Sequence, residues 1–178
     1  MAADTTEQLA SMTAEPSPMP MKGDDIDIGI PQEERSRIAQ GLSRMLADSF
    51  QLYMQTHAFH WNVEGPMFNT LHLMFMEQYT ELWNALDEIA ERIRALGFPS
   101  PGGCKAFQSL STITEVEATA EAMQMVRILV QGHEACVRTA REVLEIADEG
   151  GDEPSVDMLT QRLQVHEKTA WMLRSMLK

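Results

Sequence analysis

Apolar residues recur at intervals of three and four positions along most of this chain, which is typical of amphipathic helices. The first such segment begins at Pro31, a residue suited to a first helical turn, and ends at Gly65. A second begins at Asn69 or Thr70, both good helix caps, and ends at Gly97. No segment has the strict alternation of a strand. The pattern therefore predicts an all-α protein.

The second half of the chain continues the pattern after a long connection. A short helix is expected around residues 105–110 of that connection. Thr114 and Glu117 have the spacing of a capping box and predict the start of a third long helix, ending at Gly150, and Pro154 then opens a fourth. Two short connections and a long middle one predict a four-helix bundle with one crossover, in which the third helix runs parallel to the second. This is a ferritin-like arrangement, although a plain structural bundle would have the same pattern.

Residues 1–29 differ from the rest in being small, polar and acidic, with three closely spaced prolines. Such a stretch buries too little apolar surface to offset the entropy of ordering it. We therefore expect a flexible acidic tail over residues 1–29 and one helical domain over residues 30–178.

The charge balance limits the function classes. The chain has 14 basic and 27 acidic residues and a formal net charge of -13. This argues against binding to DNA or to anionic lipid and suits attraction of cations. Two cysteines without a CxxC spacing indicate a reducing compartment, and neither a signal peptide nor a membrane-spanning apolar run is present. A cytoplasmic protein is the expectation.

Four side chains have the chemistry of metal ligands but cannot meet within one molecule. His60 lies near the end of the first predicted helix, and His72, Asp87 and Glu91 lie on the second. His60 and His72 are equally distant from Pro66, in the middle of the predicted turn, so an antiparallel pair of helices would place them at the same height. Fifteen residues of helix separate His72 from Asp87, which is roughly 22 Å at about 1.5 Å per residue. If these residues share a metal, the carboxylates must come from a second copy of the chain.

A two-fold axis near Thr80 would solve this problem. It would pack the second helix antiparallel on its copy and form two identical centres, each with two histidines and two carboxylates. Such nitrogen and oxygen donors suit iron or zinc. The same helix has a second apolar stripe about 90° from its core stripe, as a face that meets a partner would; it contains His72, Met76, Tyr79, Trp83, Asp87 and Ala90.

Each of these residues also has a purely structural explanation. A histidine on an inner helix face is often a hydrogen-bonded core residue, and the segment DEIAERIR from Asp87 to Arg94 can be a solvated face with ion pairs. No Glu stands three positions before any of the five histidines, so the one-chain di-iron centre of ferritin-like bundles is not expected. His57, His133 and His166 have no such partners in the sequence and are interpreted as structural.

The segment THAFHWNVEGPMFNTLHLMFMEQYTELWNALDEIAERIRALG, from Thr56 to Gly97, resembles the signature region of the Dps family, and the ending HEKTAWMLRSMLK resembles it as well. These are the DNA-protection-during-starvation mini-ferritins. The resemblance implies a four-helix subunit that assembles into a hollow shell of twelve. Ferroxidase centres between subunits would oxidise Fe(II) with hydrogen peroxide or oxygen. The shell would store the ferric mineral and so protect against oxidative damage.

Carried onto this chain, the resemblance makes His60 and His72 ligands from one subunit, and Asp87 and Glu91 ligands from its two-fold partner. Trp61 matches the family's tryptophan beside the catalytic site, which would intercept oxidising equivalents; simple packing is the alternative role for this residue.

Two further points follow from the resemblance. Met76 stands where many members have a carboxylate, and a thioether is a poor iron ligand. Asp148, Asp152 and Asp157 would line acidic pores, with surface caps as the alternative. Nucleoid compaction through DNA binding, and a structural bundle holding Zn²⁺, are the alternative functions.

Overall fold

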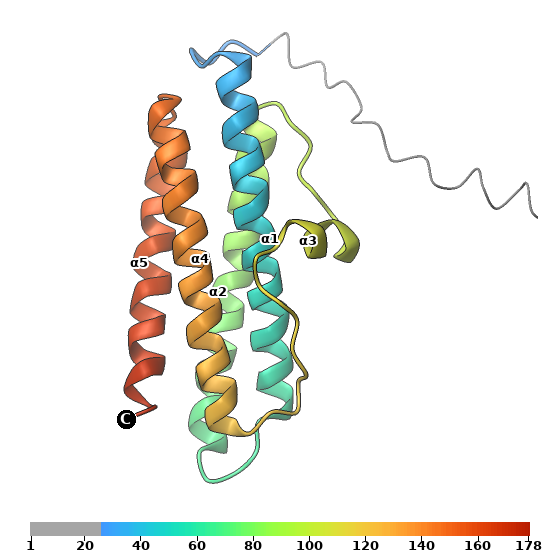
Figure 1. The fold of residues 1–178 in the computed structure, drawn as a ribbon, viewed down its shortest axis with the longest axis vertical. Coiled ribbons are helices and arrows are strands. Elements are labelled where there is room, and N and C mark those ends of the chain that lie inside the picture. Colours follow the sequence, from blue (N-terminus) through green and yellow to red (C-terminus); the bar gives the residue numbers. More distant parts are fainter. Residues whose placement is uncertain (1–25) are drawn as a thin grey trace, which may run out of the picture.

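The computed structural model describes residues 26–178, and this part of the chain consists of helices without a strand. Four long helices form a bundle, and a short fifth one lies beside it (Figure 1); they are α1 (Gln32–Asn62), α2 (Phe68–Ala95), α3 (Cys104–Leu110), α4 (Ala122–Glu149) and α5 (Glu153–Ser175). The predicted all-α class is confirmed, as is the short helix in the connection. The expected tail falls almost entirely on residues 1–25, which lie outside the described residues.

The order of the helices in space is that of a bundle with one crossover. Helices α1 and α2 form an antiparallel hairpin, and residues 96–121 then run back along the side of α1 (Figure 1). Helix α4 consequently runs parallel to α2, and α5 returns antiparallel to α4. The predicted crossover arrangement is therefore confirmed.

One continuous apolar core joins the four long helices. Burying each large side chain in it contributes about 1.5–3 kcal/mol, and its fully buried members include Leu42, Phe59, Phe75, Ile89, Leu129 and Leu173. Gly41 and Gly132 allow α1 and α4 to approach closely. A Cβ atom on Gly41 would lie 2.9 Å from Val143 Cγ1, and one on Gly132 would lie 2.7 Å from Leu52 Cδ1.

The start of α4 differs from the prediction. Thr114 and Glu117 lie in the crossover, and the helix begins only at Ala122. The physical reason is Asp48, a fully buried carboxyl group on α1. Its oxygens accept hydrogen bonds from Ser111 Oγ, from Thr112 N and Oγ1, and from Thr139 Oγ1 of α4, at 2.6–2.9 Å. These bonds hold the crossover against α1, and helix formation starts beyond them.

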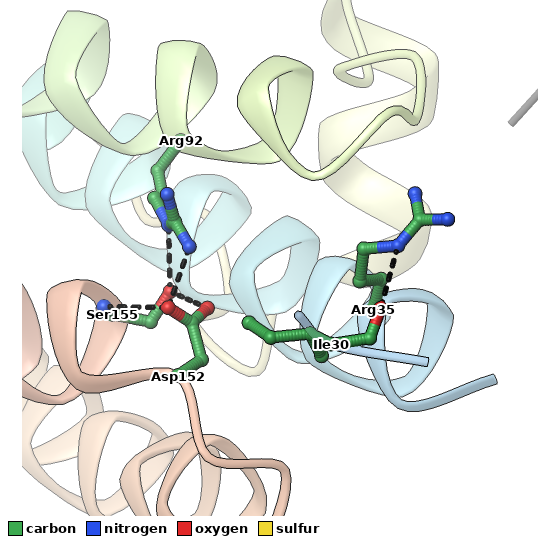
Figure 2. Close-up of polar contacts among 5 residues, drawn as sticks. All are labelled: Ile30, Arg35, Arg92, Asp152 and Ser155. Carbon is green, nitrogen blue, oxygen red and sulfur yellow. Dashed lines mark hydrogen bonds and ion pairs between the residues drawn. The ribbon is translucent and has the colours of Figure 1, made fainter. Parts of the chain in front are cut away.

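The start of α5 is fixed by a buried polar cluster that links it to α2 (Figure 2). Asp152 caps α5, accepting hydrogen bonds from Ser155 N and Ser155 Oγ, and it forms an ion pair with Arg92 of α2. Asp152 is fully buried. A fully buried carboxyl group cannot line a pore, so the pore position that the resemblance gave Asp152 is wrong. Asp152 is a helix cap, but a buried one rather than the expected surface cap. Asp148 and Asp157 are exposed, and their pore position stays a prediction.

Candidate metal centre

His60 and His72 lie face to face near the turn that joins α1 to α2. The two imidazole rings are stacked, with centroids 3.8 Å apart and an interplanar angle of 19°. His60 belongs to the last turn of α1 and His72 to the second turn of α2. The hairpin thus brings together the two histidines that the sequence predicted at equal height, and their role as ligands stays a prediction.

Each of the two rings is oriented by the backbone of the other. His60 Nδ1 lies 2.8 Å from the carbonyl oxygen of His72, and His72 Nδ1 lies 2.9 Å from the carbonyl oxygen of His60. Because a carbonyl oxygen only accepts, each Nδ1 carries the proton and donates it. The lone pair of each ring is then on Nε2, which makes no hydrogen bond among the described residues. A metal-binding histidine usually donates its other ring N–H to a carbonyl or carboxylate oxygen, and this hydrogen bond fixes the tautomer in the same way.

Asp87 and Glu91 are exposed on α2, one turn apart, well away from the two histidines. Asp87 borders an open hollow between α1, α2 and the crossover, whose lining also includes Phe50, Trp83 and Phe107. Within residues 26–178 of a single chain, no group of three or more His, Cys, Asp or Glu side chains comes together as a metal site. One chain therefore contributes two imidazoles at one place and two carboxylates at another.

The second apolar stripe of α2 connects the histidine pair with the two exposed carboxylates. Met76 is 39% exposed and Trp83 is 59% exposed, although both are large and apolar. Met76 stands one helical turn after His72 and presents a thioether rather than an oxygen donor. The candidate ligands from two chains are therefore two histidine nitrogens and two carboxylates, with a thioether at position 76.

Aromatic rings surround the histidine pair. His57 lies one turn before His60 and stacks on Tyr79, with ring centroids 4.0 Å apart. It also contacts Trp61, whose ring is tilted by 40° at a centroid distance of 4.2 Å. Burial, together with the nearby His60, lowers the pKa of His57, so it is neutral at pH 7. The sequence interpretation of His57 as a residue without partners missed this cluster. The i,i+3 spacing from His60 was the available signal.

A second histidine pair lies deep in the bundle. His133 Nδ1 of α4 and His166 Nδ1 of α5 are 2.9 Å apart, and both residues are buried. Arg162 lies near both rings and forms a bidentate ion pair with Glu81 of α2. Burial and, less strongly, Arg162 lower the pKa of His133 to about 3, and burial with the neighbouring charges lowers that of His166 as well. This pair is internal, in agreement with its structural interpretation.

Comparison with known proteins identifies the relatives of this chain. Residues 39–178 match the Ferritin-like domain family. The DNA protection during starvation protein 2 of Bacillus anthracis is 37% identical over 141 residues, covering 79% of this chain and 97% of that protein. A low temperature-induced protein of Nostoc is 39% identical over 155 residues, covering 86% of this chain and 87% of that protein.

Solved structures agree with the sequence relatives. The Dps protein of Vibrio cholerae O1, described as a member of a superfamily of ferritin-like diiron-carboxylate proteins, superposes with a TM-score of 0.82 at 32% identity. The similarity covers 85% of this chain and 95% of that one. The Dps protein of Bacillus brevis gives a TM-score of 0.79 at 34% identity, over 82% and 98% of the two chains.

The bundle, its crossover and these matches define a ferritin-like protein. Within that class, the chain belongs to the Dps family. Among the described residues, no helix has both the length and the apolar character needed to cross a membrane.

Proposed function

We propose that this protein is a mini-ferritin that oxidises Fe(II) with hydrogen peroxide or oxygen at centres shared by two subunits. It stores the ferric product inside a closed homo-oligomeric shell, a dodecamer, and so limits oxidative damage in the cytoplasm. In each centre, His60 and His72 of one subunit and Asp87 and Glu91 of its two-fold partner bind the iron. Trp61 lies beside the centre and intercepts oxidising equivalents.

The reciprocal hydrogen bonds of His60 and His72 carry this proposal. Each Nδ1–H donates to the backbone of the opposite helix, so both Nε2 lone pairs are available without any change of tautomer. A purely structural role would require only the hydrogen bonds. These two histidines also keep an Nε2 lone pair that can bind a metal ion. Two neutral imidazoles and two carboxylates form a donor set suited to iron.

The second apolar stripe of α2 supports a contact with a second copy of the chain. Its exposed apolar side chains, Met76 and Trp83, lie between the histidine pair and the exposed carboxylates. An antiparallel contact of α2 with its copy about a two-fold axis near Thr80 would bury both and would bring His72 opposite Asp87 and Glu91. The acidic charge of the chain favours the approach of Fe²⁺.

The direct test is anaerobic Fe(II) titration followed by addition of peroxide, on the wild type and on His60→Ala. We expect tight Fe(II) binding and rapid oxidation by the wild type, and loss of at least tenfold in both for the variant, because half of the nitrogen donors are gone. Glu145→Ala is the matched control, since Glu145 is an exposed carboxylate on α4, away from the centre. Oxidation no faster than in a protein-free blank would contradict the proposal.

The same titration separates the alternatives. A structural zinc bundle would bind Zn²⁺ at the centre but would oxidise no Fe(II), whereas Zn²⁺ acts in our proposal as a competitor that inhibits oxidation. Direct DNA binding is not part of the proposal. The chain is acidic and its first 25 residues contain Lys22 as their one basic residue, so it lacks the cationic surface that displaces counterions from DNA.

A further inference from the structure

Met76 is the one sulfur-containing side chain on the second apolar stripe of α2. It stands one helical turn after His72, so the two side chains lie on the same face of the helix. The side chain of Met76 is 39% exposed in the single chain, although it is apolar. On the other side of His72 lies Phe68, with ring centroids 5.0 Å apart. His72 thus has an aromatic ring toward the hairpin turn and a thioether toward the proposed two-fold axis.

The thioether of Met76 reaches back toward His72. A long side chain on a helix leans toward the helix N-terminus and covers the turn before its own Cα atom. For Met76 this turn contains His72, whose Nε2 makes no hydrogen bond among the described residues. Methionine is also flexible, so its sulfur can adjust by rotation about the side-chain bonds. An ion held by His72 Nε2 would therefore have this sulfur among its nearest neighbours.

The position beside His72 lacks a donor that suits iron. Thioether sulfur is a soft donor, whereas Fe(II) and Fe(III) prefer nitrogen and oxygen ligands. The addition of one oxygen atom to the sulfur of Met76 would change this, because the oxygen of a sulfoxide is a hard donor. The carbon chain that carries the group keeps its length, so the new donor would stand where the thioether stood.

Hydrogen peroxide performs this conversion in one balanced two-electron step. A lone pair of the sulfur attacks one peroxide oxygen, an S–O bond forms and the O–O bond breaks. The sulfur is oxidised by two electrons, and the second oxygen leaves as hydroxide, which takes a proton to become water. One thioether and one peroxide thus give one sulfoxide and one water, with no other reactant. Methionine sulfoxide reductases reverse the change.

We propose that Met76 is a modification site that becomes an iron ligand. Peroxide used at the centre converts its thioether to a sulfoxide, and the sulfoxide oxygen then holds a further iron ion beside His72. The inference rests on the function proposed above, because it presumes Fe(II) and peroxide at the His60–His72 pair. Packing of α2 against its copy is compatible with this step, since the sulfur has to meet only the peroxide that enters the centre. The iron capacity of the centre would then follow the level of oxidant.

A comparison of methionines with similar exposure tests the oxidation step. Met54 on α1 and Met172 on α5 are 43% and 42% exposed. In the assembled protein loaded anaerobically with Fe(II), limiting peroxide should oxidise Met76 in preference to these two. Peptide mass spectrometry measures the sulfoxide at each position, and the preference should be at least tenfold larger than in the iron-free protein. A hydroxyl-radical scavenger should leave it intact. An equal preference with and without iron would overturn the proposal.

The number of tightly bound Fe(II) ions tests the ligand step. After peroxide treatment and removal of iron, anaerobic titration of the wild type should give a number per chain that rises from one towards two. Treatment with methionine sulfoxide reductase should return it to the starting value. Met76→Leu has no sulfur to oxidise at this position, so peroxide should not raise its number. Met76→Glu has an oxygen donor from the start, and its number should approach two without peroxide.

Met172→Leu is the matched control, because it removes a similarly exposed thioether from α5, and peroxide should raise its number as in the wild type. If the wild type oxidises Fe(II) but sulfoxide at Met76 leaves its number unchanged, the ligand step is wrong and the proposed function stands. The same conclusion follows if Met76→Leu gains as much as the wild type, or if Met76→Glu binds no more Fe(II) than the untreated wild type. If the wild type oxidises no Fe(II), the proposed function fails and this inference fails with it.

Discussion

Two pairs of histidines in this protein show how the same side chain takes different roles. His60 and His72 each donate from Nδ1 to a backbone carbonyl, which leaves Nε2 available. His133 and His166 bond to each other through Nδ1, inside the core. The sequence distinguished the first pair by its equal distance from the hairpin turn. It could not predict the second pair, because the contact depends on how α4 and α5 are rotated against each other.

The buried pair gives a pH dependence whose sign follows from its lowered pKa values. His133 stays neutral in the folded protein down to about pH 3, whereas in the unfolded chain it takes up a proton near pH 6.5. Between these values the unfolded state binds more protons, so the free energy of unfolding falls as the pH decreases. The loss is about 1.4 kcal/mol per pH unit for each histidine that stays neutral.

Urea unfolding at pH 7.5, 6.5, 5.5 and 4.5, at one protein concentration, would measure this dependence. Because carboxylates also titrate here, the comparison is with the double variant His133→Gln, His166→Gln, whose slope below pH 6.5 should be shallower. Parallel curves for the two proteins would contradict the assignment.

At the scale of the elements, the apolar periodicity was sufficient to predict four long helices and the long connection, because each helix buries one face in the same core. The periodicity did not predict the residues at which the helices begin. Helix α2 begins at Phe68, before the expected caps, and α4 begins at Ala122 rather than after Thr114. Hydrogen bonds between Asp48 and the crossover decide the second case, and no local pattern reports a partner 64 residues away.

The role of Asp48 predicts a large effect of its removal. Asp48→Ala leaves four buried or half-buried donor contacts without their acceptor. We expect a loss of about 3 kcal/mol in the free energy of unfolding. Hydrogen exchange at Thr112 and Ile113 should also become faster.

Glu115→Ala is the matched control in the same crossover, because Glu115 is exposed, and it should change stability by less than about 0.5 kcal/mol. Equal stability of Asp48→Ala and the wild type would show that the crossover is held by its apolar contacts alone.

At the scale of the whole molecule, the sequence already contained the main feature of the proposed centre, which is that the four candidate ligands cannot meet within one chain. The helical rise separates His72 from Asp87 by roughly 22 Å, whatever the tertiary packing. The structure adds the orientation of the histidines and the exposure of Met76 and Trp83. The reciprocal hydrogen bonds were not predictable, and only the i,i+3 spacing of His57 and His60 pointed to part of the aromatic cluster, since both features depend on side-chain positions across the hairpin.

The sharing of the centre between two subunits is the central claim, and mixing two defective chains tests it most directly. His72→Ala and Asp87→Ala chains, refolded together in equal amounts, should form mixed pairs in half of the two-fold contacts. Each mixed pair contains one intact centre and one with both defects, so about a quarter of all centres should recover tight Fe(II) binding. His60→Ala mixed with His72→Ala is the control. Both defects then affect the same side of the centre, and no recovery is expected.

The measurement is the number of tightly bound Fe(II) ions per chain in the refolded mixture. Recovery of about a quarter of the wild-type value with His72→Ala and Asp87→Ala, and none in the control, is the predicted result. No recovery in either mixture, from shells that assemble normally, would contradict the shared centre.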